Sequence, residues 1–221
     1  MNAIFKSLKL RENTLDEYIC NEIIPSYGHI DYKDKIVMDI GGCFGAFSYY
    51  ALYKKAYFVY SYEPVQENYD LLTHNINKYP NVECKMAALV PHKGRETFFY
   101  PGRGTNKGIG SFVKYRGREE TTVTALNFEE ELYKIKPDVI KMDIEGGEYE
   151  LIKGPLPKFV KEVVMEIHLN RKIWRNKEAQ RLISYFKDWD IVKAPRITEA
   201  NWHTIGSWKR RKKQKIKNLW E

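Results

Sequence analysis

Short runs of β-branched and aromatic residues alternate with longer segments of helical periodicity along most of this chain. The alternation is typical of a parallel sheet with helices on both faces, because parallel strands need crossover connections and both faces of such a sheet are buried. An α/β fold with one main domain is therefore predicted. The strands are expected at 35–40, 56–63, 82–89, 139–144, 162–168, 190–194 and 203–208.

The alternation breaks after residue 89. Residues 95–100 and 112–116 are predicted to form a hairpin, and the glycine-dense stretch between them to form a long loop. One or two helices are expected ahead of the core. We therefore expect an N-terminal helical segment at 1–32, the main domain at 33–208 and a basic tail at 209–221.

Charge and cysteine content limit the class of protein. The formal net charge is +8, of which the tail, with seven basic residues and one acid, contributes six. The three cysteines are widely spaced, which argues against a disulfide framework and for a reducing compartment. No apolar run approaches the ~18 residues needed to span a bilayer, and the N-terminus lacks the apolar core of a signal peptide. These features indicate a cytoplasmic protein.

The stretch VMDIGGCFGAFS, at 37–48, reads as a strand, a glycine-rich turn and a helix N-terminus. Such a turn lets backbone amides approach a ligand closely. A GxGxxG dinucleotide motif would require glycine where Ile40 stands, so a pyrophosphate site is disfavoured. Asp39 is placed to meet an amino group, and Glu63, ending the next strand, to accept hydrogen bonds from a ribose diol. Together they point to S-adenosylmethionine, against the plainer alternative of a tight turn and a solvent-facing acid.

Six stretches, in order and at similar spacing, resemble the sequence blocks of the FkbM-type methyltransferases: VMDIGGCFGAFSYYA, SYEP, AALVPHKGRETF, GIGSFVKYRGREETTVTALNFEEEL, IKMDIEGGEYELIKG and VVMEIH. The resemblance spans 35–170, and DIEGGE is its most specific element. Gly42 and Gly147 are small-residue departures from the family pattern. The resemblance implies a class I methyltransferase fold, a Rossmann-like three-layer sandwich around a mostly parallel seven-stranded sheet. It also implies S-adenosylmethionine as cofactor and a hydroxyl acceptor on a sugar, natural product or other small molecule.

The cofactor is expected to bind along the carboxyl ends of the first, second and fourth strands, where a parallel sheet places its ligands. The residues expected to contact it are Asp39, Gly41, Gly42, Phe44, Gly45, Glu63, Ala87 and Asp143.

Three acids surround the Gly-Gly pair of DIEGGE. On a strand Asp143 and Glu145 would point to the same side, toward the ligand crevice, whereas Glu148 would start the following helix. Acids at a buried strand end are costly unless they have a partner. That partner is left open among the cofactor, the substrate, a lysine and a divalent metal such as Mg²⁺ held by Asp143 and Glu145.

Methyl transfer to a hydroxyl gains from a base that removes the proton. His168, at the end of the fifth strand, is the first candidate, and Asp143 is the second; Glu145 completes the catalytic set. The alternative for His168 is a structural strand-end histidine. Glu166 is expected to face the other polar environment of its strand or to support the site from behind. The chain lacks the Asn/Asp-Pro-Pro-aromatic motif of base N-methylation and any cysteine after Cys84, which favours an oxygen acceptor.

The acceptor is expected to meet the glycine-dense loop through Arg103, Lys107 and Ser111. In the tail, Trp208, Ile216 and Trp220 recur at helical spacing among cations, which predicts a basic amphipathic helix on an anionic membrane surface or RNA, with a solvated tail as the plain alternative. Two further functions stay open, an RNA 2′-O-methyltransferase and a non-catalytic binding protein. No oligomeric state is predicted.

Overall fold

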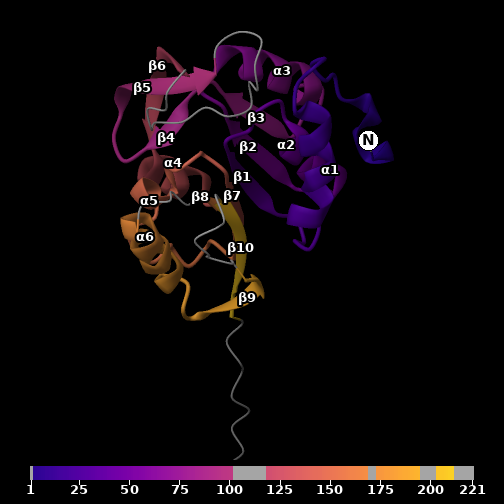
Figure 1. The fold of residues 1–221 in the computed structure, drawn as a ribbon. Helices are drawn as coiled ribbons and strands as arrows, with labels where there is room; N and C mark the ends of the chain where they lie inside the picture. Colours follow the sequence, from indigo (N-terminus) through magenta and orange to yellow (C-terminus); the bar gives the residue numbers. More distant parts are fainter. Residues whose placement is uncertain (1, 102–117, 169–172, 195–202, 212–221) are drawn as a thin grey trace, which may run out of the picture.

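The computed structural model describes residues 2–101, 118–168, 173–194 and 203–211. These residues form an α/β fold in which a seven-stranded sheet lies between two groups of helices (Figure 1). Five neighbouring strands are parallel, and β10 runs antiparallel to both of its neighbours. The order is β3 (Val82–Lys85), β2 (Phe58–Tyr62), β1 (Ile36–Ile40), β7 (Val139–Met142), β8 (Glu162–His168), β10 (His203–Arg210) and β9 (Trp189–Lys193). The predicted Rossmann-like class I methyltransferase fold is confirmed.

Helices cover both faces of the sheet, as the buried strands require. Adjacent residues of β1 show the two faces, because Val37 packs among α1, α2 and α3 whereas Met38 packs among α4, α5 and α6. In Figure 1 the first group is indigo to purple and the second is brown to orange. The helices are α1 (Asp16–Tyr27), α2 (Ala46–Tyr53), α3 (Gln66–Ile76), α4 (Phe128–Ile135), α5 (Glu148–Leu151) and α6 (Ile173–Ser184), preceded by a 3₁₀ turn at Ala3–Ser7.

The N-terminal segment shares the core of the main domain. Phe5, Cys20 and Ile23 are buried in the same cluster as the residues of α2, and the Phe5 ring lies 6.2 Å from that of Tyr49. Residues 1–32 were expected to precede the main domain. They instead contribute part of the hydrophobic core that lies between the sheet and α2.

The strand predicted at 82–89 is two strands in two sheets. β3 ends at Lys85, and β4 (Ala88–Val90) joins a three-stranded sheet of order β4-β6-β5. In this sheet β5 (Gly94–Pro101) pairs antiparallel with β6 (Arg118–Asn127), a segment that was not predicted to be a strand. Phe98 and Val123 are buried in one cluster, which favours this pairing. Residues 112–116, expected as the second strand, lie outside the described residues.

The last strand extends into the segment expected to be a basic tail. β10 runs through Arg210, whose guanidinium donates to three carbonyl groups of the loop before β8 at 2.9–3.1 Å, and Lys209 pairs with Glu162 at 3.0 Å. Trp208 is buried and stacks on Phe186 with 4.6 Å between ring centroids, so it does not belong to an amphipathic surface helix. Ile216 and the residues after it lie outside the described part. Within that part, no helix has the length and apolar character needed to cross a bilayer.

Gly206 provides a test of this packing. A Cβ atom on Gly206 would lie 2.2 Å from Cη2 of Trp208, and the Trp208 ring is held against Phe186. We expect Gly206→Ala to lower the free energy of unfolding by about 1–3 kcal/mol, measured by urea denaturation. Gly154→Ala is the control, since a Cβ there has open space, and its effect should stay within about 0.5 kcal/mol. Equal effects of the two changes would contradict the packing described.

Candidate active site

A cavity of about 250 Å³ lies at the carboxyl ends of β1, β2 and β7. From β1 the chain goes on to β2 on one side, and from β7 to β8 on the other, so this is the switch point where open α/β sheets bind ligands. Tyr18, Ile23 and Tyr27 of α1 form part of the wall. The predicted site residues that line the cavity are Gly41, Gly42, Phe44, Glu63, Ala87, Asp143 and Glu145.

The glycine turn brings three strand ends together. Gly41 has a φ of 87°, and a Cβ there would lie 1.9 Å from the backbone oxygen of Asp143. At Gly42 a Cβ would lie 2.3 Å from Oγ of Ser61, so an alanine at this position would require Ser61 to move. Gly45 precedes α2 and is not part of the cavity lining. The turn is thus constrained by close packing between strands as well as by any ligand.

Asp39 does not reach the cavity, which corrects its expected role as a ligand for an amino group. It is completely buried, accepts a hydrogen bond from Ser48 at 2.6 Å and lies 3.2 Å from Nζ of Lys141, its cross-strand neighbour on β7. Lys141 also donates to the carbonyl of Gly41 at 2.6 Å and lies 3.9 Å from Asp143. Burial raises the pKa of Asp39, and Lys141 acts against that shift.

Lys141 was not predicted as a site residue. Burial lowers its pKa, but Asp39 and Asp143 outweigh this effect, so the pKa is raised and the side chain is a cation. One signal was present in the sequence: a lysine inside an otherwise apolar strand is rarely buried unless a carboxylate pairs with it.

Glu63 is held rigidly at the end of β2. It is nearly buried, and its carboxylate accepts hydrogen bonds from the backbone N–H groups of Cys43 (2.9 Å) and Val65 (3.0 Å) and from the amide of Asn68 (3.3 Å). Asn68 in turn accepts from Arg11 at 2.7 Å. Burial raises the pKa of Glu63 to about 7. Arg11 and Asn68 were missed, because only the fold brings the N-terminal segment to α3.

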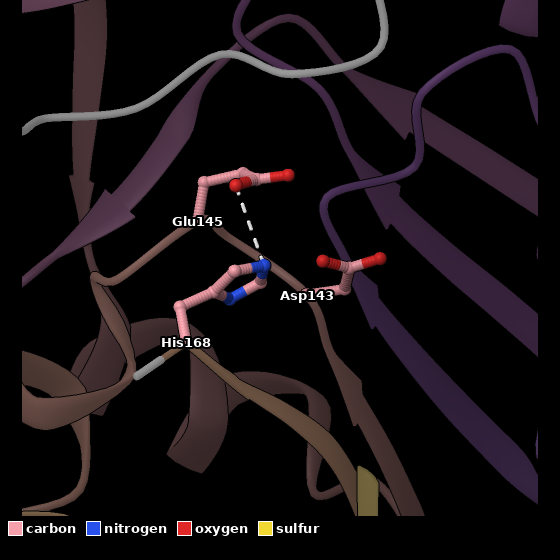
Figure 2. A group of neighbouring side chains, drawn as sticks. All are labelled: Asp143, Glu145 and His168. Carbon is pink, nitrogen blue, oxygen red and sulfur yellow. Dashed lines mark ion pairs between the residues drawn. The ribbon is translucent and has the colours of Figure 1, made fainter. Parts of the chain in front are cut away.

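Asp143 and Glu145 come together through a turn, and not through the strand alternation expected. β7 ends at Met142, and the chain then takes positive φ values of 55° at Glu145 and 103° at Gly146. The Glu145 carboxylate is thereby directed over the ring of His168, with 3.3 Å between Oε2 and Nε2, and Asp143 lies beside this pair (Figure 2).

Glu148 was expected only to start the following helix, and the structure gives it a more specific role. It is completely buried, its Oε1 lies 2.9 Å from Nδ1 of His168, and the same oxygen accepts from the N–H groups of Ile144 and Gly146 at 3.3 and 3.2 Å. Its Oε2 has no hydrogen-bond partner among the described residues. Glu148 therefore both closes the acidic turn and orients the imidazole.

Four carboxylates surround His168, and we call Asp143, Glu145, Glu148 and Glu166 the acidic cluster. Burial lowers the pKa of His168, but the nearby carboxylates, first Glu148 and then Glu145, hold it well above its usual value. Glu166 lines the cavity instead of supporting it from behind, and burial and repulsion by Asp143 raise its pKa to about 8. The other expected acceptor contacts, Arg103, Lys107 and Ser111, lie outside the described residues.

The buried ion pair gives a prediction about stability. Lys141→Met would leave the Asp39 carboxylate buried without a cation, so we expect a loss of about 3–5 kcal/mol in the free energy of unfolding. Adding Asp39→Asn should recover part of this loss, which a double-mutant cycle in urea measures. Lys153→Met, at an exposed lysine paired only with the exposed Glu150, is the control and should change stability by less than about 1 kcal/mol. A similar cost for both lysines would exclude the structural role of the pair.

Comparison with known proteins found a relative among the characterised sugar-modifying enzymes. The chain is 25% identical over 138 residues to the hexuronic acid methyltransferase AglP of Haloferax volcanii. The match covers 62% of this chain and 57% of that protein, so the chain spans a little over half the length of this relative.

Solved structures with a similar fold include a methylase and a protein bound to S-adenosyl-homocysteine. The ribosomal protein L11 methylase of Lactobacillus delbrueckii subsp. bulgaricus has 13% identity and a TM-score of 0.48, with 89% of this chain and 79% of that chain covered. The TrmK protein of M. capricolum, in complex with S-adenosyl-homocysteine, has 10% identity and a TM-score of 0.49, with 88% and 69% covered.

A family model identifies the chain more directly. The model of the methyltransferase FkbM domain matches residues 39–191, from Asp39 in β1 to Ile191 in β9. The match includes the glycine turn, Glu63 and all of the acidic cluster. Because it covers more than half of the chain, the protein belongs to the FkbM methyltransferase family.

Proposed function

We propose that the protein transfers a methyl group from S-adenosylmethionine to a hydroxyl group of a sugar, a glycan or another small molecule. The observation that carries the proposal is that one cavity joins Glu63, a nearly buried carboxylate at the end of β2, to the acidic cluster at the ends of β7 and β8. Membership of the FkbM family supports methyl transfer, and the relative that acts on hexuronic acid supports a sugar acceptor.

The residues of the cavity fit the cofactor. The Glu63 carboxylate receives three hydrogen bonds, and Oε2 receives only one of them, from Cys43, so this oxygen is able to accept another from a ribose hydroxyl. Ala87 and Leu89 provide apolar surface on which the adenine base of the cofactor can pack. Asp143 and Glu145 line the other end, where they offset the positive charge of a sulfonium.

The chain's own part in the reaction is to position the acceptor and remove its proton. The bound cofactor supplies a methyl group activated by a positive sulfur. The acceptor oxygen would lie beside Asp143, Glu145 and His168, in line with the methyl group, and holding it there supplies much of the rate enhancement. The carboxylates of Asp143 and Glu145 are available to take up the hydroxyl proton, and a base in this position adds about 10²- to 10⁴-fold. His168, whose pKa these carboxylates raise, acts beside them as a cation that positions the acceptor.

Glu63 makes cofactor binding dependent on pH. With a pKa of about 7, its carboxyl is mostly protonated at pH 6 and mostly ionised at pH 8, and the ionised form is the better acceptor for a ribose hydroxyl because neither oxygen carries a proton. We therefore expect affinity for S-adenosylhomocysteine, measured by calorimetry, to rise roughly tenfold over this interval.

The variant Glu63→Gln isolates this effect from that of other groups near the cavity, including Glu166, Lys141 and Arg11. It should bind the ligand weakly and with little dependence on pH. Glu67→Gln, at an exposed carboxylate of α3, should keep the slope of the wild type. An unchanged slope in Glu63→Gln would exclude Glu63 as the ribose ligand.

The activity itself is tested with labelled cofactor against hexuronic acids, neutral sugars, lipid-linked glycans and RNA. We expect label in a sugar hydroxyl, and a fall in kcat of about 10²- to 10⁴-fold for both His168→Ala and Asp143→Asn. His74→Ala, at an exposed histidine of α3, is the control and should keep full activity. Transfer to RNA alone would replace the sugar acceptor, and failure to bind any cofactor would reject the proposal.

A further inference from the structure

We propose that Asp143, Glu145 and His168 bind a divalent transition-metal ion at the acidic end of the cavity. One carboxylate oxygen from each acid and one imidazole nitrogen all lie within 4.8 Å of one another, and Figure 2 shows the three side chains around a common space. The proposal rests on the proposed function, because it gives these residues a particular way to hold the acceptor oxygen.

The backbone fixes the three ligands from two neighbouring strands. Asp143 and Glu145 leave the end of β7, and His168 ends β8, which pairs with β7 in parallel register. Their side chains are partly accessible, with exposed fractions of 31% for Asp143, 26% for Glu145 and 15% for His168. An ion could therefore reach them from the cavity and keep open coordination positions.

The imidazole is oriented as in metal sites. Glu148 faces Nδ1 at 2.9 Å, and because a carboxylate accepts, Nδ1 carries a hydrogen. Nε2 faces Glu145 at 3.3 Å and Glu166 at 3.6 Å, and without an ion the Nε2 proton lies between the ring and these carboxylates. A divalent ion would displace that proton and bind Nε2 and the Glu145 carboxylate in its place. Histidines that bind metals typically donate their other N–H to a carboxylate in this way.

The charges point independently to a cation. Glu148 is completely buried against His168, and its Oε2 has no hydrogen-bond partner in the described part of the chain. Lys141, 3.9 Å from Asp143, is already held by Asp39 and the carbonyl of Gly41. Even with His168 as a cation, the acids of the acidic cluster outnumber the positive charges that face them, and a divalent ion in place of the imidazole proton would reduce this excess.

The ligand atoms select the class of metal. One imidazole nitrogen with carboxylate oxygens suits Mn²⁺, Fe²⁺ or Zn²⁺, whereas Mg²⁺ prefers oxygen ligands and retains its water. The hypothesis of Mg²⁺ on Asp143 and Glu145 is therefore replaced by a transition-metal site that includes His168.

An acceptor hydroxyl on an open position of the ion would have a lowered pKa. Its proton would pass to the ionised form of Glu166, which lines the same cavity. The oxygen then forms a bond to the methyl carbon as the carbon–sulfur bond breaks, and the electron pair of that bond stays on sulfur.

Mn²⁺ is the probe for the test. Full-length protein without an affinity tag, stripped with a chelator, is titrated with Mn²⁺ while the free ion is followed by electron paramagnetic resonance. We expect one ion per chain, with Kd weakened roughly tenfold or more in both His168→Ala and Glu145→Gln. Glu150→Gln removes an exposed carboxylate of α5 and should leave Kd unchanged. Circular dichroism confirms that each variant is folded, and Glu145→Gln, at a partly exposed side chain, keeps the test decisive if His168→Ala does not fold.

Absence of Mn²⁺ binding, binding that Glu145→Gln leaves intact, or equal competition by Mg²⁺ would each overturn the proposal. The titration contains neither cofactor nor acceptor, so its result is independent of methyl transfer. Site-dependent Mn²⁺ binding without any methylation would support the metal site and reject the proposed function. Methylation by a protein that binds no Mn²⁺ would support the proposed function and reject the metal site.

Discussion

Asp39 of β1 and Lys141 of β7 face each other in the middle of the sheet, where both side chains are buried away from water. A charge in such a place is costly unless an opposite charge compensates it, so each residue requires the other. The pair joins the two strands at the switch point, and Lys141 also holds the carbonyl of Gly41 and approaches Asp143. The floor of the cavity therefore depends on this one interaction.

A second layer of contacts aligns the groups that face the ligand. Glu148 receives two backbone N–H groups of the acidic turn and contacts His168 at the same time, so the turn after β7 and the end of β8 are set by one carboxylate. The left-handed conformation of Glu145 is costly for a residue other than glycine. This conformation places the Glu145 carboxylate beside the His168 imidazole, where it is available for proton transfer or for binding an ion.

The N-terminal segment completes the site from the other side. Arg11 connects Asp16, at the start of α1, to Asn68 of α3, and Asn68 supports Glu63. Residues of α1 also form part of the cavity wall, among them the largely exposed Tyr18. The position of Glu63 thus depends on contacts from a segment that the sequence alone suggested to be peripheral.

The sequence by itself determined the α/β fold, the glycine turn after β1 and the strand-end positions of Glu63, Asp143 and His168. Strand periodicity and turn residues act over a few neighbouring positions, and that is why they can be read directly. The split between β3 and β4, the pairing of 118–127 with β5 and the burial of Trp208 could not be predicted, because they depend on which distant surfaces pack together.

Only the tertiary structure decided what each acid does. Asp39 and Asp143 both lie near the ends of neighbouring strands. Asp39 is nevertheless buried beside Lys141, whereas Asp143 lines the cavity. Glu148 looks like an ordinary helix-start acid until the fold brings it to His168, 20 positions away in the chain. A carboxylate's role follows from the cations and donors within a few ångströms of it, and those neighbours are chosen by the packing of the sheet and not by the order of the residues.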